Sequence, residues 1–457
     1  MRTADALLRG GIRDAAARRA AGAVTSSALV AAALDRSARL NERLRAFVEL
    51  WPDAASAAAA TADAVPRTPH PLHGLPVAHK DIFARLGRQP SCGVAAPWGD
   101  KPLPPSPALA AVQATGAVEV GALTLAEFAL GTTGTNAFFG NAGNPWSLGR
   151  CTGASSSGSG VAVAASLVFA ALGTDTGASC RVPASFCGVV GLKPTPGIVP
   201  TEGVFPLSWS LDTVGMLARG VDDCAILFAA ARGAYPPPAV EPDARLSIGM
   251  PRRYYTDHLM PAVAFAWEEG RRILERAGHQ VRDVDVVETA EIRSLIRVIM
   301  RSEAAAVHRP LLAAHPGNYP LSVRSFFAAG YAAAAIDYVD AQRLRGALLR
   351  EALATTFAEV DVLLTPAVPV LPPLYAEVSD AGDAGAWQLI TLLAHYTQPS
   401  SFLGQPALVV PAGLSPEGLP IGLQLIGRPG AEDTLFRAAL PLEEAFRALG
   451  VAPSAID

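Results

Sequence analysis

Three short stretches of the sequence carry residue types that could perform nucleophilic chemistry. The first is Gly74–Asp81, in which Lys80 follows an apolar run flanked by Gly and Pro. A lysine buried at the end of a strand has a lowered pKa, because desolvation disfavours its charged form, and it can then act as a base near neutral pH. The alternative interpretation is a surface lysine that is paired with Asp81.

The second stretch is Gly153–Gly160, a run of Gly, Ala and Ser that includes Ser155 and Ser156. A flexible linker is one interpretation of this composition. The run is short and leads directly into an apolar segment, which favours a tight loop at a helix N-terminus that presents N–H groups and hydroxyls to an oxyanion. The Walker phosphate-binding pattern fails, because no Lys-Ser or Lys-Thr pair follows the last glycine.

The third stretch is Thr174–Arg181, which contains Gly177 and Ser179. Successive N–H groups of a Gly-containing turn can form an oxyanion hole beside a serine hydroxyl. The nucleophile elbow of α/β-hydrolases requires Gly-x-Ser-x-Gly, and that pattern fails here because Cys180 and Arg181 follow the serine. On its residues alone, this stretch fits a structural turn as well as a catalytic one.

A serine nucleophile needs a base to take its proton. Lys80 is one candidate base. In a Ser-His-Asp arrangement the base would be His79, His258 or His395, and none of these lies in a recognisable triad context. No group of His, Cys, Asp or Glu has metal-ligand spacing, so we expect no metal. The 5 cysteines include no CxxC pair and suggest no disulfide framework, which favours a reducing, cytoplasmic location.

These stretches must be positioned by strands and helices that interleave along the whole chain. Helical spacing of apolar residues predicts helices over 1–64, 125–130, 262–277 and 433–449. Short apolar runs predict strands at 75–79, 246–250, 280–286, 362–364, 407–410 and 421–426. Strand–helix–strand order is typical of crossover units in a sheet, so the fold class is α/β.

Composition excludes several classes of protein. The 457 residues include 37 Lys+Arg and 41 Asp+Glu, and this balance lacks the clustered basic charge of a nucleic-acid binder. The mean hydropathy is +0.28. No run approaches the ~20 apolar residues that a membrane-spanning helix requires. We therefore expect a small-molecule partner, with neither nucleic acid nor membrane bound.

Taken together, these motifs resemble the amidase signature family of serine hydrolases. The matching stretches are Gly74–Asp81, Asn144–Trp146, Gly153–Ser159, Leu172–Thr195, Ser210–Gly215 and Gly418–Gly427. The resemblance implies one large α/β/α sandwich, with a mixed central sheet covered by helices, that spans residues 1–457 as a single domain. Within it we expect N-terminal helices over 1–64, a signature core over 70–230, a less characteristic region over 240–360, and C-terminal strands and a helix over 361–449.

The resemblance also assigns roles to individual residues. Ser179 matches the acylated nucleophile, Ser155 the bridging serine that follows a cis peptide bond after Ala154, and Lys80 the base. The remaining matches are to an oxyanion hole and substrate-contacting loop (Thr176, Gly177, Ala178, Gly131 and Thr132) and to supporting positions (Asp175, Ser156 and Arg181).

The chain departs from the usual family pattern at three positions. Ala154, Ser157 and Ala178 stand where glycine is common. Ala178 is the most consequential of these, because an alanine would be strained if this position of the oxyanion turn required a positive φ.

The leading interpretation is a cytoplasmic amidase that hydrolyses the carbon–nitrogen bond of a linear, non-peptide, small-molecule amide without a cofactor. One alternative is the A-type subunit of a glutamine amidotransferase, in which the same triad releases ammonia for a partner protein. It ranks lower because no basic extension suited to tRNA is evident. A second alternative is a non-catalytic binding protein on an amidase scaffold. A homodimer is left open.

Overall fold

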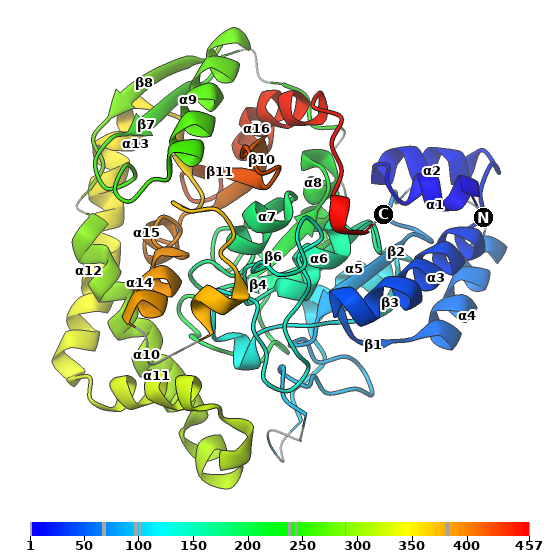
Figure 1. Cartoon of the computed structure of the whole chain (residues 1–457), viewed down its shortest axis with the longest axis horizontal. Helices are drawn as coiled ribbons and strands as arrows, with labels where there is room; N and C mark the ends of the chain where they lie inside the picture. The colour runs from blue at the N-terminus through cyan, green and yellow to red at the C-terminus, as the bar shows by residue number, and fades with distance from the viewer. Residues whose placement is uncertain are drawn as a thin grey trace.

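The computed structural model describes residues 2–65, 70–95, 99, 102–235, 239–242, 245–287, 289–379 and 384–456. Within this part of the chain, an 11-stranded sheet has the order β1-β3-β2-β4-β6-β5-β10-β11-β9-β7-β8 (Figure 1). The strands are β1 Phe47–Leu50, β2 Pro76–Lys80, β3 Val118–Leu123, β4 Ala170–Asp175, β5 Val190–Lys193, β6 Thr213–Ala218, β7 Ser247–Pro251, β8 Gln280–Val284, β9 Val362–Pro366, β10 Ala407–Leu414 and β11 Pro420–Gly427.

Helices precede, connect and follow these strands. They are α1 Arg2–Leu7, α2 Ile12–Ala20, α3 Ser26–Leu44, α4 Pro52–Ala64, α5 Pro107–Ala114, α6 Ser157–Ala164, α7 Arg181–Cys187, α8 Val221–Ala231, α9 Pro261–Arg276, α10 Thr289–Ala314, α11 Leu321–Tyr331, α12 Ala335–Ala354, α13 Thr356–Glu359, α14 Ala384–Leu392, α15 Gln398–Phe402 and α16 Glu432–Arg447, with 3-10 turns at Glu127–Ala129, Pro316–Asn318, Tyr375–Val378 and Ser454–Ile456.

The central strands separate two apolar cores. Along β4, Leu172 belongs to one core and Ala171 to the other, and along β6 Met216 and Leu217 divide in the same way. Successive residues of a strand point to opposite faces of a sheet, so this alternation shows that both faces are covered. Helices α8 and α16 supply side chains to the first core, and α6 and α7 supply side chains to the second.

The sheet is mixed, as the family resemblance implies. β2 is parallel to both of its neighbours, β3 and β4, whereas β4, β6, β5, β10, β11 and β9 follow one another in antiparallel pairs. The expected α/β class, with a mixed sheet between helices, is confirmed. The division into a single domain stays a prediction.

The parallel pairing of β2 and β4 positions the chemistry-bearing residues. Parallel strands end at the same edge of a sheet, and here Ala78 pairs with Ala171 and His79 with Leu172. Lys80 at the end of β2 therefore lies beside Thr174 and Asp175 at the end of β4.

Two parts of the expected secondary structure are wrong. The range 1–64, expected to be helical, also contains β1, which follows the left-handed residue Arg45 (φ 45°) at the end of α3. The helix expected over 125–130 is only a 3-10 turn, because Phe128 (φ 51°) and Ala129 (φ 62°) adopt the left-handed conformation. An L-residue in this conformation cannot continue a right-handed helix.

Two further features are absent from the part of the chain that the structure describes. No helix there combines the length and apolar character that crossing a bilayer requires. No group of three or more His, Cys, Asp or Glu side chains among those residues could hold a metal ion.

Candidate active site

Lys80 lies fully buried at the end of β2. Its Nζ is 2.7 Å from Ser155 Oγ and 2.7 Å from Thr174 Oγ1. Burial lowers the pKa of Lys80 to about 8, against the opposing effect of acidic groups such as Asp212 and Asp175. The alternative of a surface lysine paired with Asp81 is wrong, because the Asp81 carboxylate accepts a hydrogen bond from Arg88 at 2.7 Å and Lys80 is inaccessible.

The loop that carries Ser155 is held by hydrogen bonds to the segment that contains Ala126 and Thr132. The cis peptide bond expected between Ala154 and Ser155 is present. Ala154 N–H donates to the Thr132 carbonyl at 3.0 Å, and the Ser155 carbonyl accepts from Ala126 N–H at 3.2 Å. Gly153 (φ 74°) has no room for a side chain, since an added Cβ would lie 2.7 Å from the backbone nitrogen of Pro183. The expected loop at a helix N-terminus is therefore present, followed by α6.

The predicted substrate-contacting loop adjoins this serine loop. Gly131 has a φ of 142°, a conformation that glycine adopts readily. Thr132 directs its carbonyl to Ala154, and its hydroxyl donates to the Ile390 carbonyl at 3.3 Å. The structure thus brings Gly131 and Thr132 next to Ser155.

Ser156 joins Ser155 to the turn that carries Ser179. Its N–H donates to the Ser179 carbonyl at 3.0 Å, and its hydroxyl donates to the Thr174 carbonyl at 3.1 Å. Ser179 lies two residues before α7 and is 6% exposed, whereas Ser155 and Ser156 are fully buried. Lys80, Ser155 and the Ser179 turn therefore form one connected, buried group.

Asp175 and Arg181 fix the turn between them. The Asp175 carboxylate accepts from the N–H groups of Cys180 and Arg181 at 3.0 and 3.3 Å, and from the Arg181 guanidinium at 2.9 and 3.0 Å. Burial by itself would raise the pKa of Asp175, but the charge and hydrogen bonds of Arg181 lower it overall. Asp175 and Arg181 thus hold the turn through buried hydrogen bonds, and their supporting role in catalysis stays a prediction.

The turn Thr176–Ser179 leaves its backbone available to a ligand. In the described residues, no hydrogen-bond acceptor is found for the N–H groups of these four residues. Such a set of N–H groups can stabilise an oxyanion. An added Cβ on Gly177 would lie 3.2 Å from Met300 Cε and 3.7 Å from Gln398 Cγ, so these two side chains lie against the turn.

The alanine in this turn is not strained. The non-glycine residues with positive φ in the described part of the chain are Arg45, Cys92, Phe128, Ala129, Ser166, Tyr254 and His258. Ala178 is not among them, and neither are Ala154 and Ser157. The replacement of glycine at these three positions therefore does not conflict with the backbone conformation.

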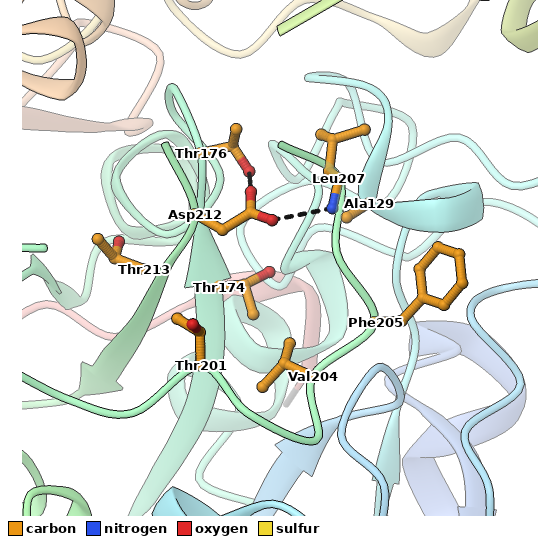
Figure 2. Close-up of a pocket in the computed structure, with 9 residues that line it drawn as sticks. All are labelled: Ala129, Thr174, Thr176, Thr201, Val204, Phe205, Leu207, Asp212 and Thr213. Atoms are coloured by element: carbon orange, nitrogen blue, oxygen red, sulfur yellow. Dashed lines mark hydrogen bonds between the residues drawn. The ribbon is translucent and has the colours of Figure 1, made fainter. Parts of the chain in front are cut away.

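Two residues close to Lys80 were not identified from the sequence, namely Thr174 and Asp212. They line a small pocket (Figure 2) with Ala129, Thr176, Thr201, Val204, Phe205, Leu207 and Thr213. Asp212 accepts hydrogen bonds from the Thr176 hydroxyl at 2.5 Å and from Leu207 N–H at 2.9 Å. Burial raises the pKa of Asp212 to about 6. Thr174 lies in the stretch Thr174–Arg181 and Asp212 in Ser210–Gly215. These two motifs were the sequence signal that could have identified them.

The three histidines considered as bases lie elsewhere. His79 Nδ1 is 2.8 Å from Glu119 Oε1 on β3. The His395 ring stacks on Tyr254, with centroids 4.4 Å apart, and meets His258 edge-on at 5.7 Å. None of these rings is hydrogen-bonded to Ser155 or Ser179 in the described structure, so a Ser-His-Asp arrangement is not formed.

Comparisons with known proteins identify the family of the chain. The amidase family model matches residues 28–436. The A-type subunit of glutamyl-tRNA(Gln) amidotransferase from Geobacter metallireducens is 36% identical over 467 residues, covering 91% of this chain and 92% of its own. A solved amidase structure covers 96% of this chain and 100% of its own, with 32% identity and a TM-score of 0.86. The solved A-type subunit of glutamyl-tRNA(Gln) amidotransferase from Thermotoga maritima covers 90% of each chain, with 28% identity and a TM-score of 0.74. Because the family model and the Geobacter relative each extend over most of the chain, the protein belongs to the amidase family.

Proposed function

We propose that the chain hydrolyses the carbon–nitrogen bond of a small-molecule amide through an acyl-enzyme on Ser179. The observation that carries the proposal is the buried Lys80 Nζ, 2.7 Å from Ser155 Oγ, with a pKa lowered by burial to about 8. A lysine in this state is partly neutral near pH 7 to 8 and can accept a proton, as a general base must.

The proposed reaction has two steps, acylation of Ser179 and hydrolysis of the acyl-enzyme. Ser179 Oγ forms a bond to the amide carbon while its proton passes to Ser155 Oγ, and the Ser155 proton passes to Lys80 Nζ. The N–H groups of Thr176–Ser179 stabilise the developing oxyanion. The proton then returns through Ser155 to the leaving nitrogen as the C–N bond breaks. Water adds to the acyl-enzyme by the same relay and releases the acid and Ser179.

A second candidate function is the ammonia-releasing component of a glutamine amidotransferase. The specific observation in its favour is the name of the Geobacter relative, which is 36% identical to this chain. That name supports the second candidate more directly than a free-standing amidase, whereas the higher TM-score of the solved amidase favours the first. Both candidates use the same attack on an amide carbonyl, and they differ in substrate and in the need for partner subunits.

The test is to assay the purified chain by itself on simple amides and on glutamine, measuring ammonia and free acid separately. We expect release of both products from simple amides, and Ser179→Ala and Lys80→Ala are expected to lower kcat/KM by about a thousandfold or more. The control is Arg39→Ala, an exposed residue of α3 outside the hydrogen-bond relay, which is expected to retain hydrolysis.

Each competing interpretation predicts a different result. Activity that is retained in Lys80→Ala and lost in His395→Ala would contradict the assigned base. Turnover of glutamine only in the presence of partner subunits would favour the amidotransferase. A chain whose Ser179 failed to react with a fluorophosphonate probe would fit the non-catalytic binding protein. The cytoplasmic location, the homodimer left open and the expected lack of a nucleic-acid or membrane partner stay predictions.

A further inference from the structure

Three arginines follow one face of α10 at intervals of about one helical turn. Arg293, Arg297 and Arg301 are half-buried and four residues apart, so they lie above one another on the helix. In the described residues, none of them forms an ion pair with a carboxylate, and the Nε atoms of Arg293 and Arg301 are buried without a hydrogen-bond partner. Burial and the charges of its two neighbours lower the pKa of Arg297.

Met300 places this arginine row next to the reacting turn. Its Cε would lie 3.2 Å from a Cβ on Gly177, between the proposed oxyanion N–H groups. Met300 lies three residues after Arg297 and directly before Arg301 on the helix. Because three residues of helix rise ~4.5 Å, the Arg297 side chain starts within about one turn of the residue that contacts the oxyanion turn.

The segment that leads into α15 also lies near the arginine row, because α15 packs against α10 (Figure 1). His395 in this segment is buried, and both of its ring nitrogens lack a hydrogen-bond partner in the described structure. Burial, together with the charges of Arg293, His258 and Arg297, lowers the pKa of His395 to about 3, so the ring is neutral. Gln398 also has an unpartnered buried Oε1, and its Cγ would lie 3.7 Å from a Cβ on Gly177.

These observations describe a site built for negative charge. Three cations without a carboxylate partner among the described residues lie on α10, and Met300 of the same helix and Gln398 of α15 both lie against Gly177. Arginine binds carboxylates through paired, charge-assisted hydrogen bonds, and such a ligand would also relieve the repulsion within the row.

We propose that the arginine row binds a carboxylate of the substrate, so that the preferred substrate is an amide with a carboxylate about one helical turn from the scissile carbonyl. This inference rests on the proposed function of Ser179 and names its substrate class. Glutamine has such a carboxylate, but its α-ammonium would be repelled by the same arginines. We therefore expect ω-carboxylated amides without an ammonium group to react faster than glutamine.

The first experiment compares kcat/KM for pairs of amides that differ in one carboxylate. The pairs are succinamate and butyramide, glutaramate and pentanamide, and adipamate and hexanamide, with glutamine as a further substrate. For at least one pair, we expect the wild-type chain to prefer the carboxylated member by about ten- to hundredfold. Arg297→Gln is expected to reduce that ratio towards one. The control is Arg309→Gln, an exposed arginine of the same helix, which is expected to keep the ratio.

The second experiment measures binding without turnover. Titration of glutarate into Ser179→Ala by calorimetry is expected to show binding that Ser179→Ala/Arg297→Gln loses and Ser179→Ala/Arg309→Gln retains. Circular dichroism of each variant shows whether it is folded, and Arg293→Gln replaces Arg297→Gln if the latter is not.

The outcomes separate this inference from the proposed function. Hydrolysis of both members of every pair at equal rates, or equal loss on both in Arg297→Gln, would contradict the arginine row as a carboxylate site while leaving the hydrolase intact. Absence of hydrolysis and of fluorophosphonate labelling would contradict the proposed function, and the glutarate titration would still test the arginines. Binding of tRNA but not of glutarate would also overturn the inference.

Discussion

Thr174 holds Lys80 as closely as Ser155 does. Each hydroxyl lies 2.7 Å from Nζ, so the amine has two fixed partners in a site without exposure to solvent. Thr174→Val keeps the shape of the side chain and removes one partner, leaving Lys80 free to turn away from Ser155. We expect kcat to fall by about ten- to hundredfold, since a buried donor then lacks its acceptor. Steady-state kinetics check this, and Thr174→Ser, which retains the hydroxyl, should keep most of the activity.

We expect Asp212 to influence the pH at which Lys80 becomes a base. Burial lowers the pKa of Lys80 to about 8, and the negative charge of Asp212 is among the groups that oppose this decrease. Asp212→Asn removes that charge, so the pKa of Lys80 should fall further. Activity requires neutral Lys80 and rises as pH increases through this pKa, and the acidic limb of the kcat/KM profile should therefore move to lower pH in the variant. An acidic limb that stayed in place, or that moved to higher pH, would contradict this role.

The family resemblance, more than the local pattern, singled out the three residues of the proposed relay, and it did not reveal their surroundings. Ser155, Ser179 and Lys80 stand out because small residues crowd around two of them and an apolar strand precedes the third. Thr174 and Asp212 lie in motif stretches of the sequence, but no local pattern places them beside Lys80. Thr174 meets Lys80 across 94 residues of sequence, and only the pairing of β2 with β4 brings the two together.

At the scale of elements, one buried arginine connects the nucleophile turn to the C-terminal half. Arg181, the first residue of α7, donates to Ser400 at 2.8 Å and Ser401 at 2.8 Å on α15 and to Gln424 at 2.8 Å on β11, besides its ion pair with Asp175. A substitution of Arg181 therefore leaves several buried acceptors unpaired, and with them a buried carboxylate.

We predict that Arg181→Met lowers the free energy of unfolding by about 3–5 kcal/mol, the range for breaking a buried ion pair from one side. Denaturation by urea, followed by circular dichroism, measures this loss. The matched control is Arg39→Met, which removes an exposed ion pair to Asp35 on α3 and is expected to change stability by about 0.5 kcal/mol or less. Similar losses in both variants would show that burial of the Arg181 network is not what stabilises the fold.

The elements that the sequence predicted are those with a strong local pattern. Apolar runs correctly indicated strands such as β9, β10 and β11. Residues 125–130 have a helical pattern of apolar side chains, but tertiary contacts decide their backbone. Phe128 N–H donates to the Cys92 carbonyl at 2.7 Å, and Ala126 N–H donates to the Ser155 carbonyl. These bonds to distant segments hold the left-handed residues in place and are absent from any local pattern.

At the scale of the whole molecule, the chain uses lysine sparingly and places it in the core. It has 3 lysines, Lys80, Lys101 and Lys193, beside a large excess of arginine. Lys80 at the end of β2 and Lys193 at the end of β5 are both fully buried. Lysine loses its charge on burial more readily than arginine, so these two positions can hold a neutral amine inside the protein. Lys193 has no part in the proposed reaction, and its effect should appear in stability.

Lys193 should make the stability of the whole molecule depend on pH. Burial lowers its pKa from 10.5 to about 7, and its ammonium donates to the Pro194 carbonyl at 3.0 Å. Below about pH 7 the folded and unfolded states both carry the proton, and the buried charge then destabilises the folded state most. Above that pH only the unfolded state is protonated, so the penalty shrinks as pH rises, by up to about 1.4 kcal/mol for each pH unit.

Lys193→Met removes this titration. We compare the free energy of unfolding of Lys193→Met with that of the wild-type chain. The value for the variant minus the value for the wild type should be largest near pH 6.5 and should decrease steadily towards about pH 8.5. Urea unfolding at three pH values measures the difference. Loss of the hydrogen bond to Pro194 adds an offset that does not depend on pH, so the slope and not the absolute difference decides the outcome.

Lys80→Met, in which the missing group has a pKa of about 8, should show the same slope beginning about one pH unit higher. Parallel curves for Lys193→Met and the wild-type chain would mean that the buried amine carries the same charge in both states, which is incompatible with its lowered pKa.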